Sequence, residues 1–405
     1  MNNTPRGDRL HIALFGRRNT GKSSLINALT HQEIAVVSDI PGTTTDPVYK
    51  SMEVVPLGPV IFIDTPGIDD EGALGRLRID KTREVLRKTD IAILVVTGEG
   101  RWGSREEWLA EQFKEQRVPF VIALNKSDEL KDGKFLKAIP AIDGVPVVRT
   151  SAKTGEGIED LIRRLIELKK EDDSSLHLVD GLVKTGDLVI LVTPIDSGAP
   201  KGRLILPQQQ VLRDILDKGA AGLVVKETQL QQALNRLTQP PDMVITDSQI
   251  FDKVEALLPS KVPLTSFSII YARNKGNLGL FYWAVKEIQG LKDGDNILVA
   301  EGCTHHRQDD DIGTVKIPSL LRKRTGKRLN FHHISGGFFK EDLSPYSMII
   351  HCGGCMLNKR EMEYRQVFSE QRGVPMINYG IILAYVHGML DRVLEPFKKE
   401  LSERG

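Results

Sequence analysis

The stretch His11-Ile-Ala-Leu-Phe-Gly16-Arg-Arg-Asn-Thr-Gly21-Lys22-Ser23 decides the fold of the N-terminal part of this chain. It begins as a short apolar strand and continues into the pattern G-x-x-x-x-G-K-S/T, before a helix-like stretch. In this pattern, glycines let backbone N–H groups surround phosphates, the lysine reaches the β- and γ-phosphates, and the serine binds Mg²⁺. The predicted phosphate-site residues are Gly16, Asn19, Thr20, Gly21, Lys22, Ser23 and Ser24.

Two further motifs supply groups that respond to the terminal phosphate. Gly42-Thr43-Thr44-Thr45-Asp46 fits a switch loop in which Thr44 completes the Mg²⁺ shell. Asp64-Thr65-Pro66-Gly67 follows an apolar run. We expect Asp64 to hold a Mg²⁺-bound water and the N–H of Gly67 to contact the γ-phosphate.

Base selection is expected from two later loops. Asn125-Lys126-Ser127-Asp128 follows another apolar run, and Ser151-Ala152-Lys153 completes the base pocket. The carboxylate of Asp128 can accept from both N1–H and N2–H₂ of guanine, and adenine offers no such pair of donors. The chain is therefore predicted to bind GTP and GDP with Mg²⁺ and to be a GTPase. The predicted catalytic residues are Lys22, Thr44, Asp64, Gly67 and Asn19.

Short apolar runs alternate with helix-like stretches along the whole chain. In the first block the runs are residues 11–15, 60–64, 91–96, 120–124 and 145–148; later runs are 188–193, 222–225, 243–246, 296–300, 347–351 and 374–377. This alternation is typical of parallel sheets covered by helices. We expect an α/β protein of three domains: a P-loop GTPase fold (1–172) and two smaller α/β domains (173–264 and 265–405).

Composition limits the class of protein. The 405 residues are 40% hydrophobic and 27% charged, with a formal net charge of +1. Such a balance gives no electrostatic reason to expect nucleic acid or an anionic membrane as partner. There is no apolar run of about 18 residues and no apolar leader near the start. Three cysteines argue against a disulfide framework, so we expect a cytoplasmic protein with reduced thiols and no membrane partner.

All three cysteines lie in two short clusters in the last quarter of the chain. The first is Cys303-Thr-His305 and the second is His351-Cys352-Gly-Gly-Cys355. Each cluster follows one of the predicted strands, at 296–300 and 347–351. If those strands are parallel neighbours in one sheet, both clusters lie at its carboxyl edge, where open α/β sheets bind ligands.

The residue pattern leaves three chemistries open at these clusters. A structural zinc site could use the three cysteines and either His305 or His351. A four-iron cluster could use the three cysteines and leave one iron for a different ligand, because such clusters normally take four protein ligands. A redox dithiol would not require Cys303 or the histidines. The residues alone do not separate zinc from iron–sulfur.

The N-terminal block, residues 8–170, resembles GTPases of the Era and TrmE type on the motifs quoted above. Two positions bear on mechanism. Ile68 stands where Ras-like enzymes carry the glutamine that orients water, and Asn19 stands where the TrmE-like group supports potassium binding. The resemblance implies slow intrinsic hydrolysis stimulated by K⁺ near Asn19.

The order C-T-H and then H-C-G-G-C behind a TrmE-like domain resembles the HydF family, the maturation GTPases of FeFe-hydrogenases. This resemblance covers the whole chain and implies a GTPase domain, a central dimerisation domain that forms a homodimer, and a C-terminal cluster domain. It implies a 4Fe-4S cluster on Cys303, Cys352 and Cys355. His305 and His351 would be the motif histidines, either as a labile iron ligand or as hydrogen-bond donors to a cluster sulfur.

The same resemblance implies a role in cofactor assembly. Such a protein carries a transient two-iron subcluster precursor, made with the help of two radical-SAM maturases, and delivers it to apo-hydrogenase. Switch loops ordered by GTP could then alter domain contacts and partner release. The alternative is a ribosome- or RNA-associated GTPase with a structural zinc domain, against which the near-neutral charge counts. The basic run 322–328 is either a docking patch or a solvated helix end.

Overall fold

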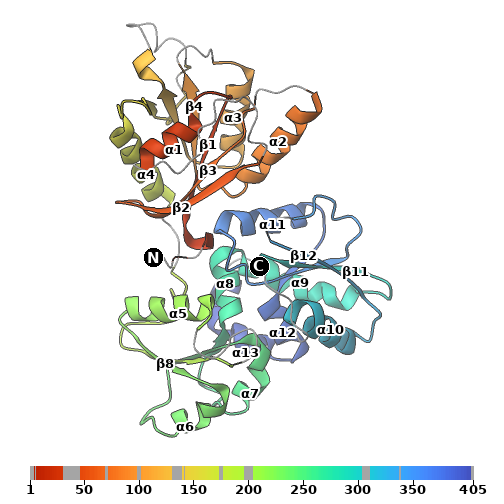
Figure 1. Cartoon of the computed structure of the whole chain (residues 1–405). Helices are drawn as coiled ribbons and strands as arrows, with labels where there is room; N and C mark the ends of the chain where they lie inside the picture. Colours follow the sequence, from red (N-terminus) through yellow and green to blue (C-terminus); the bar gives the residue numbers. More distant parts are fainter. Residues whose placement is uncertain are drawn as a thin grey trace. The chain divides into compact units, whose positions relative to one another are not determined.

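The computed structural model describes the chain in two compact units, residues 1–174 and 175–405, and each is treated by itself (Figure 1). The described residues are 4, 6–30, 46–68, 72–97, 102–129, 139–140, 142–172, 177–195, 204–302, 311–336 and 339–402. Three predicted site residues, Thr44, Cys303 and His305, lie outside them. No helix in these ranges is long and apolar enough to cross a membrane.

The first unit is built on a six-stranded sheet in the order β2-β3-β1-β4-β5-β6. Its strands are β1 Leu10–Gly16, β2 Val48–Val54, β3 Gly58–Asp64, β4 Ile91–Thr97, β5 Phe120–Asn125 and β6 Val147–Arg149. All neighbours run parallel except β2 and β3. The predicted parallel sheet is confirmed. Strand β2 was not predicted because, as a half-exposed antiparallel edge, it carries polar residues among its apolar ones.

Helices cover both faces of this sheet. They are α1 Lys22–Thr30, α2 Gly72–Leu86, α3 Ser104–Glu115 and α4 Ile158–Asp172, with 3-10 turns η1 Arg6–Asp8 and η2 Ser127–Glu129. Figure 1 shows α1 and α4 on one side and α2 and α3 on the other. Each side has its own buried apolar cluster. Since the central strand β1 is buried on both faces, it holds the phosphate loop at a rigid point of the sheet.

The second unit contains two four-stranded parallel sheets. The first has the order β10-β9-β7-β8, from β7 Leu188–Val192, β8 Ala221–Val225, β9 Met243–Thr246 and β10 Leu264–Ser266. Its helices are α5 Leu206–Asp217, α6 Leu230–Leu234 and α7 Phe251–Glu255, with turns η3 Glu227–Gln229 and η4 Ser248–Ile250. The predicted strands at 188–193, 222–225 and 243–246 are confirmed within one residue at each end.

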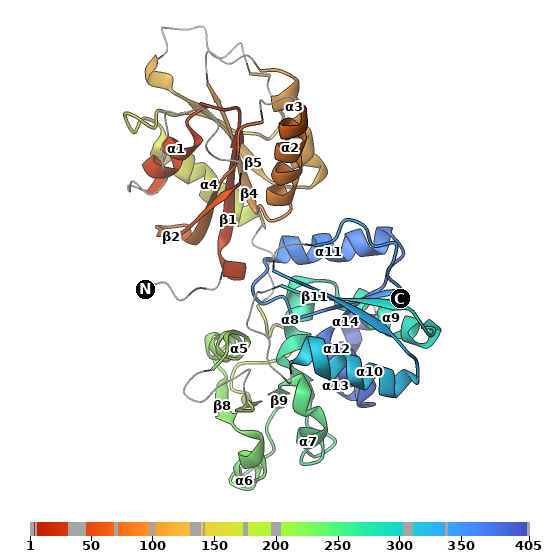
Figure 2. The ribbon, with the colours of Figure 1, turned by 45° about the vertical axis from the view of Figure 1, so that its right-hand side comes forward.

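The second of these sheets has the order β12-β11-β13-β14, all parallel, and its strands are β11 Asn296–Glu301, β12 Asn330–Ser335, β13 Met348–His351 and β14 Met376–Asn378. Its helices are α8 Phe267–Lys275, α9 Leu278–Glu287, α10 Ile317–Thr325, α11 Lys359–Gln371, α12 Tyr379–Val386, α13 Leu390–Leu394 and α14 Lys398–Ser402, with η5 Ile288–Gly290, the π-helical turn η6 Ile312–Lys316 and η7 Glu395–Phe397. Helix α10 packs against α12 (Figure 2).

Chain direction reverses in the middle of this last sheet. After β11 the chain moves outward to β12, whereas after β13 it moves the other way to β14. The adjacent carboxyl ends of β11 and β13 therefore form a topological switch point, the usual ligand site of an open α/β sheet. One buried apolar cluster runs from Val179 to Phe397 and serves both sheets of the unit. The predicted domain boundary at residue 264 stays a prediction.

Candidate functional site

The phosphate loop connects β1 to α1 and depends on two glycines at close approaches. A Cβ atom on Gly16 would lie 2.3 Å from the carbonyl oxygen of Val95 in β4. Gly21 has a φ of +85°, and a Cβ there would lie 2.4 Å from the side-chain nitrogen of Asn125. Glycine is the residue that tolerates both the positive φ and the contact, so the loop conformation follows from the sequence pattern.

Polar groups for phosphate and Mg²⁺ gather beside this loop. The Nζ of Lys22 donates to the carbonyl oxygens of Gly16 (3.2 Å) and Arg17 (2.7 Å). The hydroxyl of Ser23 donates to the carboxylate of Asp64 at the end of β3. Burial raises the pKa of Asp64, and the hydrogen bond from Ser23 and the charge of Lys22 oppose that rise. Two of the three predicted Mg²⁺ ligands are thus side by side.

The remaining predicted phosphate-site residues lie where their motif requires. Asn19 has a φ of 59°, a left-handed conformation that asparagine adopts more readily than most residues. Thr20 is buried, and its hydroxyl donates to the Arg17 carbonyl at 2.9 Å, while Ser24 is half-buried in the first turn of α1. Gly67 lies against the loop, since a Cβ there would be 2.7 Å from the Arg18 nitrogen.

Asn125 ties the phosphate loop to the base loops. Its side-chain nitrogen donates to the Thr20 carbonyl at 2.9 Å, and its side-chain oxygen accepts from the Ala152 N–H at 3.1 Å. The side chain is almost fully buried, with 1% exposed. Since a buried amide must satisfy both its donors and its acceptor, Asn125 fixes the spacing between the two loops.

Asp128 is an exposed carboxylate held in place from one side. The hydroxyl of Ser151 donates to its Oδ1 at 2.5 Å, and this bond is the main cause that holds the pKa of Asp128 below its usual range. Lys126 adopts a φ of 61°, and Lys153 is exposed beside the same loop. The arrangement presents an ionised acceptor to solvent at the place where the motif predicts guanine.

An ion pair at the phosphate loop was missed by sequence reasoning. Arg17 donates through Nε (2.6 Å) and Nη2 (2.7 Å) to the two carboxylate oxygens of Glu106, a side chain that is 4% exposed. Glu106 also accepts from the N–H of Gly103 at 3.0 Å, at the start of α3. The pair joins residues far apart in the chain, so no local pattern could have indicated it.

Cys352 lies at the switch point of the C-terminal sheet. Ala300 is in register with His351, and the N–H of Cys352 donates to the Ala300 carbonyl at 3.0 Å. The sulfur of Cys352 accepts from the N–H groups of Gly302 (3.1 Å) and Gly354 (3.4 Å). The expectation that both cysteine clusters follow parallel neighbouring strands is confirmed. The residue before Cys303 therefore contacts the sulfur of Cys352.

A buried lysine holds the Cys352–Cys355 turn from below. Lys275, at the end of α8, is 3% exposed. Its Nζ donates to the carbonyl oxygens of Gly354 (3.4 Å), Cys355 (3.2 Å) and Leu357 (2.6 Å). An ammonium is an obligatory triple donor, so this one residue satisfies three carbonyls of the turn. Nothing in the local sequence of α8 indicates this role.

His351 is enclosed in a buried polar chain. Its Nε2 lies 3.0 Å from Nη1 of Arg365, which also donates to Glu361 at 2.9 Å. Because arginine can only donate, Nε2 accepts, and Nδ1–H donates to the carbonyl of Cys352 at 2.8 Å. Burial, together with the arginine, lowers the pKa of His351 to about 3. Both ring nitrogens are engaged, so the histidine positions the backbone of Cys352.

The donor set fits a soft metal ion or an iron–sulfur cluster. Cys352 and Cys355 are half-buried free thiols from one tight turn, and thiolates are the ligands that such centres use. Burial raises the pKa of the Cys352 thiol to about 11, so metal binding must displace a proton. Within the described ranges no group of three or more metal-ligating side chains is present, and the first cysteine cluster lies outside them.

A carboxylate beside this turn was also missed. Glu301 ends β11, is 4% exposed, and accepts a hydrogen bond from the hydroxyl of Tyr379 at 3.1 Å. Burial, and then the negative charge of Glu301, raise the pKa of Tyr379 well above its usual value. The phenol is therefore a fixed donor. The signal for Glu301 was its position directly before the Gly302-Cys303 step.

The basic run at 322–328 is partly engaged in the fold. Arg322 donates to the Leu329 carbonyl at 2.8 Å and stacks on Phe331. Arg324 lies over the ring of Tyr385, and Arg328 pairs with Asp293 at 3.4 Å. A docking role for the run stays a prediction.

Comparison with known families divides the chain into three matched stretches. Residues 178–276 match the hydrogen maturase F dimerization domain, and residues 279–396 match the hydrogen maturase F tetramerization domain. Residues 11–126 match the family of 50S ribosome-binding GTPases.

Curated relatives match mainly over the first unit. The tRNA modification GTPase MnmE of Prochlorococcus marinus (strain NATL1A) is 39% identical over 173 residues, which is 42% of this chain and 36% of the relative. GTPase Era of Halothermothrix orenii is 32% identical over 164 residues, or 40% of this chain and 55% of the relative. This chain therefore spans little more than a third of the MnmE relative and about half of the Era relative.

Solved structures also resemble part of the chain. The G-domain protein NFeoB of S. thermophilus bound to GDP·AlF4⁻ is 27% identical, with a TM-score of 0.32, and covers 40% of this chain and 64% of its own. Era in complex with MgGDPNP and a 16S ribosomal RNA fragment is 20% identical, with a TM-score of 0.34, over 53% of this chain and 92% of its own.

Proposed function

The chain belongs to the HydF family of hydrogenase maturation GTPases, and we propose that it is the scaffold and carrier on which the two-iron subcluster precursor is held and then delivered to apo-hydrogenase. GTP hydrolysis is its own reaction. Cluster carriage is its purpose. The two radical-SAM maturases are the proposed suppliers of the precursor, and the cytoplasm is the proposed compartment.

One observation carries the cluster part of this proposal: the sulfur of Cys352 lies at the switch point, 3.1 Å from the N–H of Gly302. The chain leaves β11 there toward Cys303, while Cys355 lies on the same turn as Cys352. Cys303, Cys352 and Cys355 would hold a 4Fe-4S cluster. Bound to three thiolates, such a cluster keeps one iron able to exchange its fourth ligand, as a carrier requires.

The histidines have different proposed roles. His351 is engaged on both ring nitrogens, so it supports the turn through the Cys352 carbonyl, as outer partners of metal ligands commonly do. A metal-ligand role for it would require breaking the bond from Arg365. His305 is then the motif histidine left as a proposed exchangeable ligand.

GTP binding and hydrolysis rest on the groups around the phosphate loop. Lys22 would contact the β- and γ-phosphates, Ser23 and Asp64 would hold Mg²⁺ with Thr44, and Gly67 would contact the γ-phosphate. Ile68 is 5% exposed in the apolar cluster under α3, so no polar side chain orients water from that position. The chain therefore depends on charge stabilisation near the transferred phosphate.

Potassium is the proposed source of that charge. We expect GTP turnover in KCl to exceed turnover in NaCl of equal ionic strength by roughly tenfold, since about 1.4 kcal/mol of transition-state stabilisation gives that factor. An Asn19→Ala variant should lose the difference by falling to the sodium rate. Steady-state phosphate release in the two salts measures this. Equal rates in both salts for the unchanged chain would contradict it.

Self-association through the central sheet is proposed from its edge. Strand β8 ends the sheet order, and its residues Ala221–Val225 carry no charge. Val224 is 36% exposed. An uncharged, half-exposed edge strand is a ready template for pairing with another chain. A homodimer formed by this edge agrees with the matched dimerization domain.

Anaerobic reconstitution tests the function. The chain, reconstituted with iron and sulfide and then loaded by the two maturases, should show the broad visible absorption of a cysteine-ligated cluster and should activate apo-hydrogenase. A colourless protein that binds zinc stoichiometrically and activates nothing would instead favour the RNA-associated GTPase with a structural zinc domain.

Lys275 offers a test of how the turn is held. A Lys275→Met variant leaves three buried carbonyl oxygens without their ammonium donor, at a cost of about 1–3 kcal/mol in the free energy of unfolding. Iron retention during anaerobic dialysis should fall in parallel. A Lys292→Met variant, which changes an exposed lysine, is the control. Equal urea midpoints for both variants would show that Lys275 does not support the turn.

A further inference from the structure

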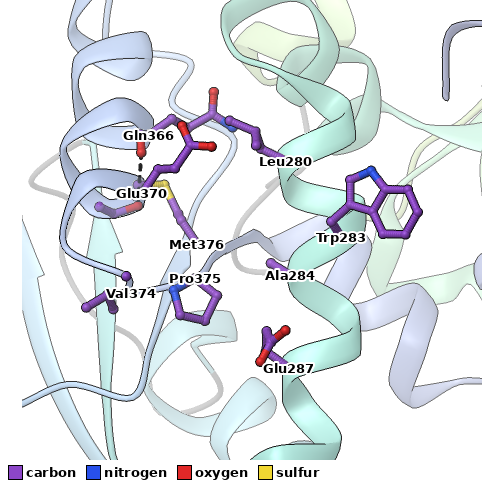
Figure 3. Close-up of a pocket in the computed structure, with 11 residues that line it drawn as sticks. Leu280, Trp283, Ala284, Glu287, Gln366, Glu370, Val374, Pro375 and Met376 are labelled. Atoms are coloured by element: carbon purple, nitrogen blue, oxygen red, sulfur yellow. Dashed lines mark hydrogen bonds between the residues drawn. The ribbon is translucent and has the colours of Figure 1, made fainter. Parts of the chain in front are cut away.

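A groove between α9, α11 and β14 is the largest surface feature that neither proposed site uses. Its volume is about 420 Å³. Figure 3 shows Leu280 and Ala284 on the α9 wall and Val374, Pro375 and Met376 along the opposite side and floor. Two exposed carboxylates, Glu287 and Glu370, stand at its rim. Apolar walls with a charged rim are typical of a protein contact surface.

Beside the groove, α9 carries an exposed and braced indole. Trp283 is 40% exposed, and in Figure 3 its ring points away from the groove. Lys286 places its ammonium 3.6 Å from the centre of the indole, and the ring of Tyr282 meets it edge-on at 5.6 Å. The side chain is thus held in one orientation before any partner arrives, which lowers the entropy cost of binding.

Knob and groove on one face make this surface complementary to itself. In a two-fold contact, whatever one copy offers is received by the same region of the other. An indole buries about 150–250 Å² when enclosed, and tryptophan is enriched among the residues that dominate interface energy. A groove of 420 Å³ has room for it. The ammonium of Lys286 would accompany the indole toward the carboxylates of Glu287 and Glu370.

We propose that Trp283 of one copy inserts into the groove of a second copy, and that the second copy's Trp283 reciprocates. Every lining residue lies within residues 279–396, the stretch that matches the tetramerization domain. The proposal rests on that match and extends the proposed self-association. The β8 edge builds the dimer, and the Trp283 contact joins two dimers.

Sedimentation velocity of the full chain over a range of concentrations tests this contact. The unchanged chain should reach a tetramer, and Trp283→Glu should stop at the dimer, with the tetramer dissociation constant raised at least about 30-fold. Trp283→Phe should restore much of the association. The matched control is Val367→Glu, since Val367 is 47% exposed on α11 and does not line the groove.

Three measurements keep the outcome clear. Trp283→Ala introduces no charge and should weaken the tetramer in the same direction, so a folding defect of the glutamate variant would not decide the result. GTP turnover and iron content, taken on the same samples, report the proposed function separately. A tetramer that survives Trp283→Glu and Trp283→Ala as it survives the control, or an unchanged chain that never exceeds a dimer, overturns the proposal.

Discussion

A Cys352→Ala variant is expected to lose cluster binding entirely while it hydrolyses GTP at the original rate. The sulfur of Cys352 is the group on which the N–H of Gly302 and the N–H of Gly354 converge. Changing even an outer partner of a metal ligand costs roughly 10–100-fold in affinity, and loss of the ligand itself costs more. With two of three thiolates left, the four-iron cluster would not survive purification.

Iron and sulfide content after anaerobic reconstitution, with the visible spectrum, measures the loss. The matched control is Met356→Ala, which removes an exposed sulfur-containing side chain from the same turn. GTP turnover should be unchanged in both variants, because the nucleotide motifs belong to the other compact unit. Full iron content in Cys352→Ala would remove this cysteine from the proposed ligand set.

The second large effect is a change of base specificity in Asp128→Asn. The carboxylate can accept from N1–H and N2–H₂ of guanine, whereas the asparagine amide would direct a donor at the N2 amino group. Sites that hydrogen-bond a base discriminate strongly against a mismatched partner, by about 10⁴ or more. Xanthine has a carbonyl at that position and should be accepted instead.

Asp128→Asn is a clean test because the local fold keeps its bond. Ser151 donates to Oδ1 of Asp128, and an asparagine oxygen can accept the same bond. GTP and XTP turnover, each as kcat/KM, should therefore exchange rank without a change in thermal stability. Glu129→Gln, at the exposed neighbouring carboxylate, is the control and should leave GTP preferred. Unaltered preference for GTP in Asp128→Asn would place base recognition elsewhere.

Most of the nucleotide site could be predicted from the sequence because its residues form contiguous motifs. Each motif follows a buried strand of one parallel sheet, so the order of strands brings the loops to a common edge. The contact between Ser23 and Asp64, and that between Asn125 and Ala152, follow from this geometry. The ion pair of Arg17 with Glu106 does not, since it depends on where α3 packs.

Elements with mixed polarity were the ones missed. Strands β2 and β12 are edge strands with polar and half-exposed positions, and β10 is three residues long. Helix α10 ends in basic residues that stack on neighbouring rings. The predicted helix at 380–394 divides into α12 and α13, because Gly388 takes a φ of +73° between them. Periodicity is weak wherever an element is only partly buried.

By itself the sequence determined the chemistry: a phosphate loop, a guanine motif, and thiols in C-T-H and H-C-G-G-C order, because each is written in adjacent residues. Tertiary structure decided how that chemistry is held. Parallel pairing of β11 and β13 brought Gly302 to the sulfur of Cys352. Lys275 and Arg365 were recruited from helices packed beneath. Buried polar groups must find partners, and only packing determines which distant residue supplies them.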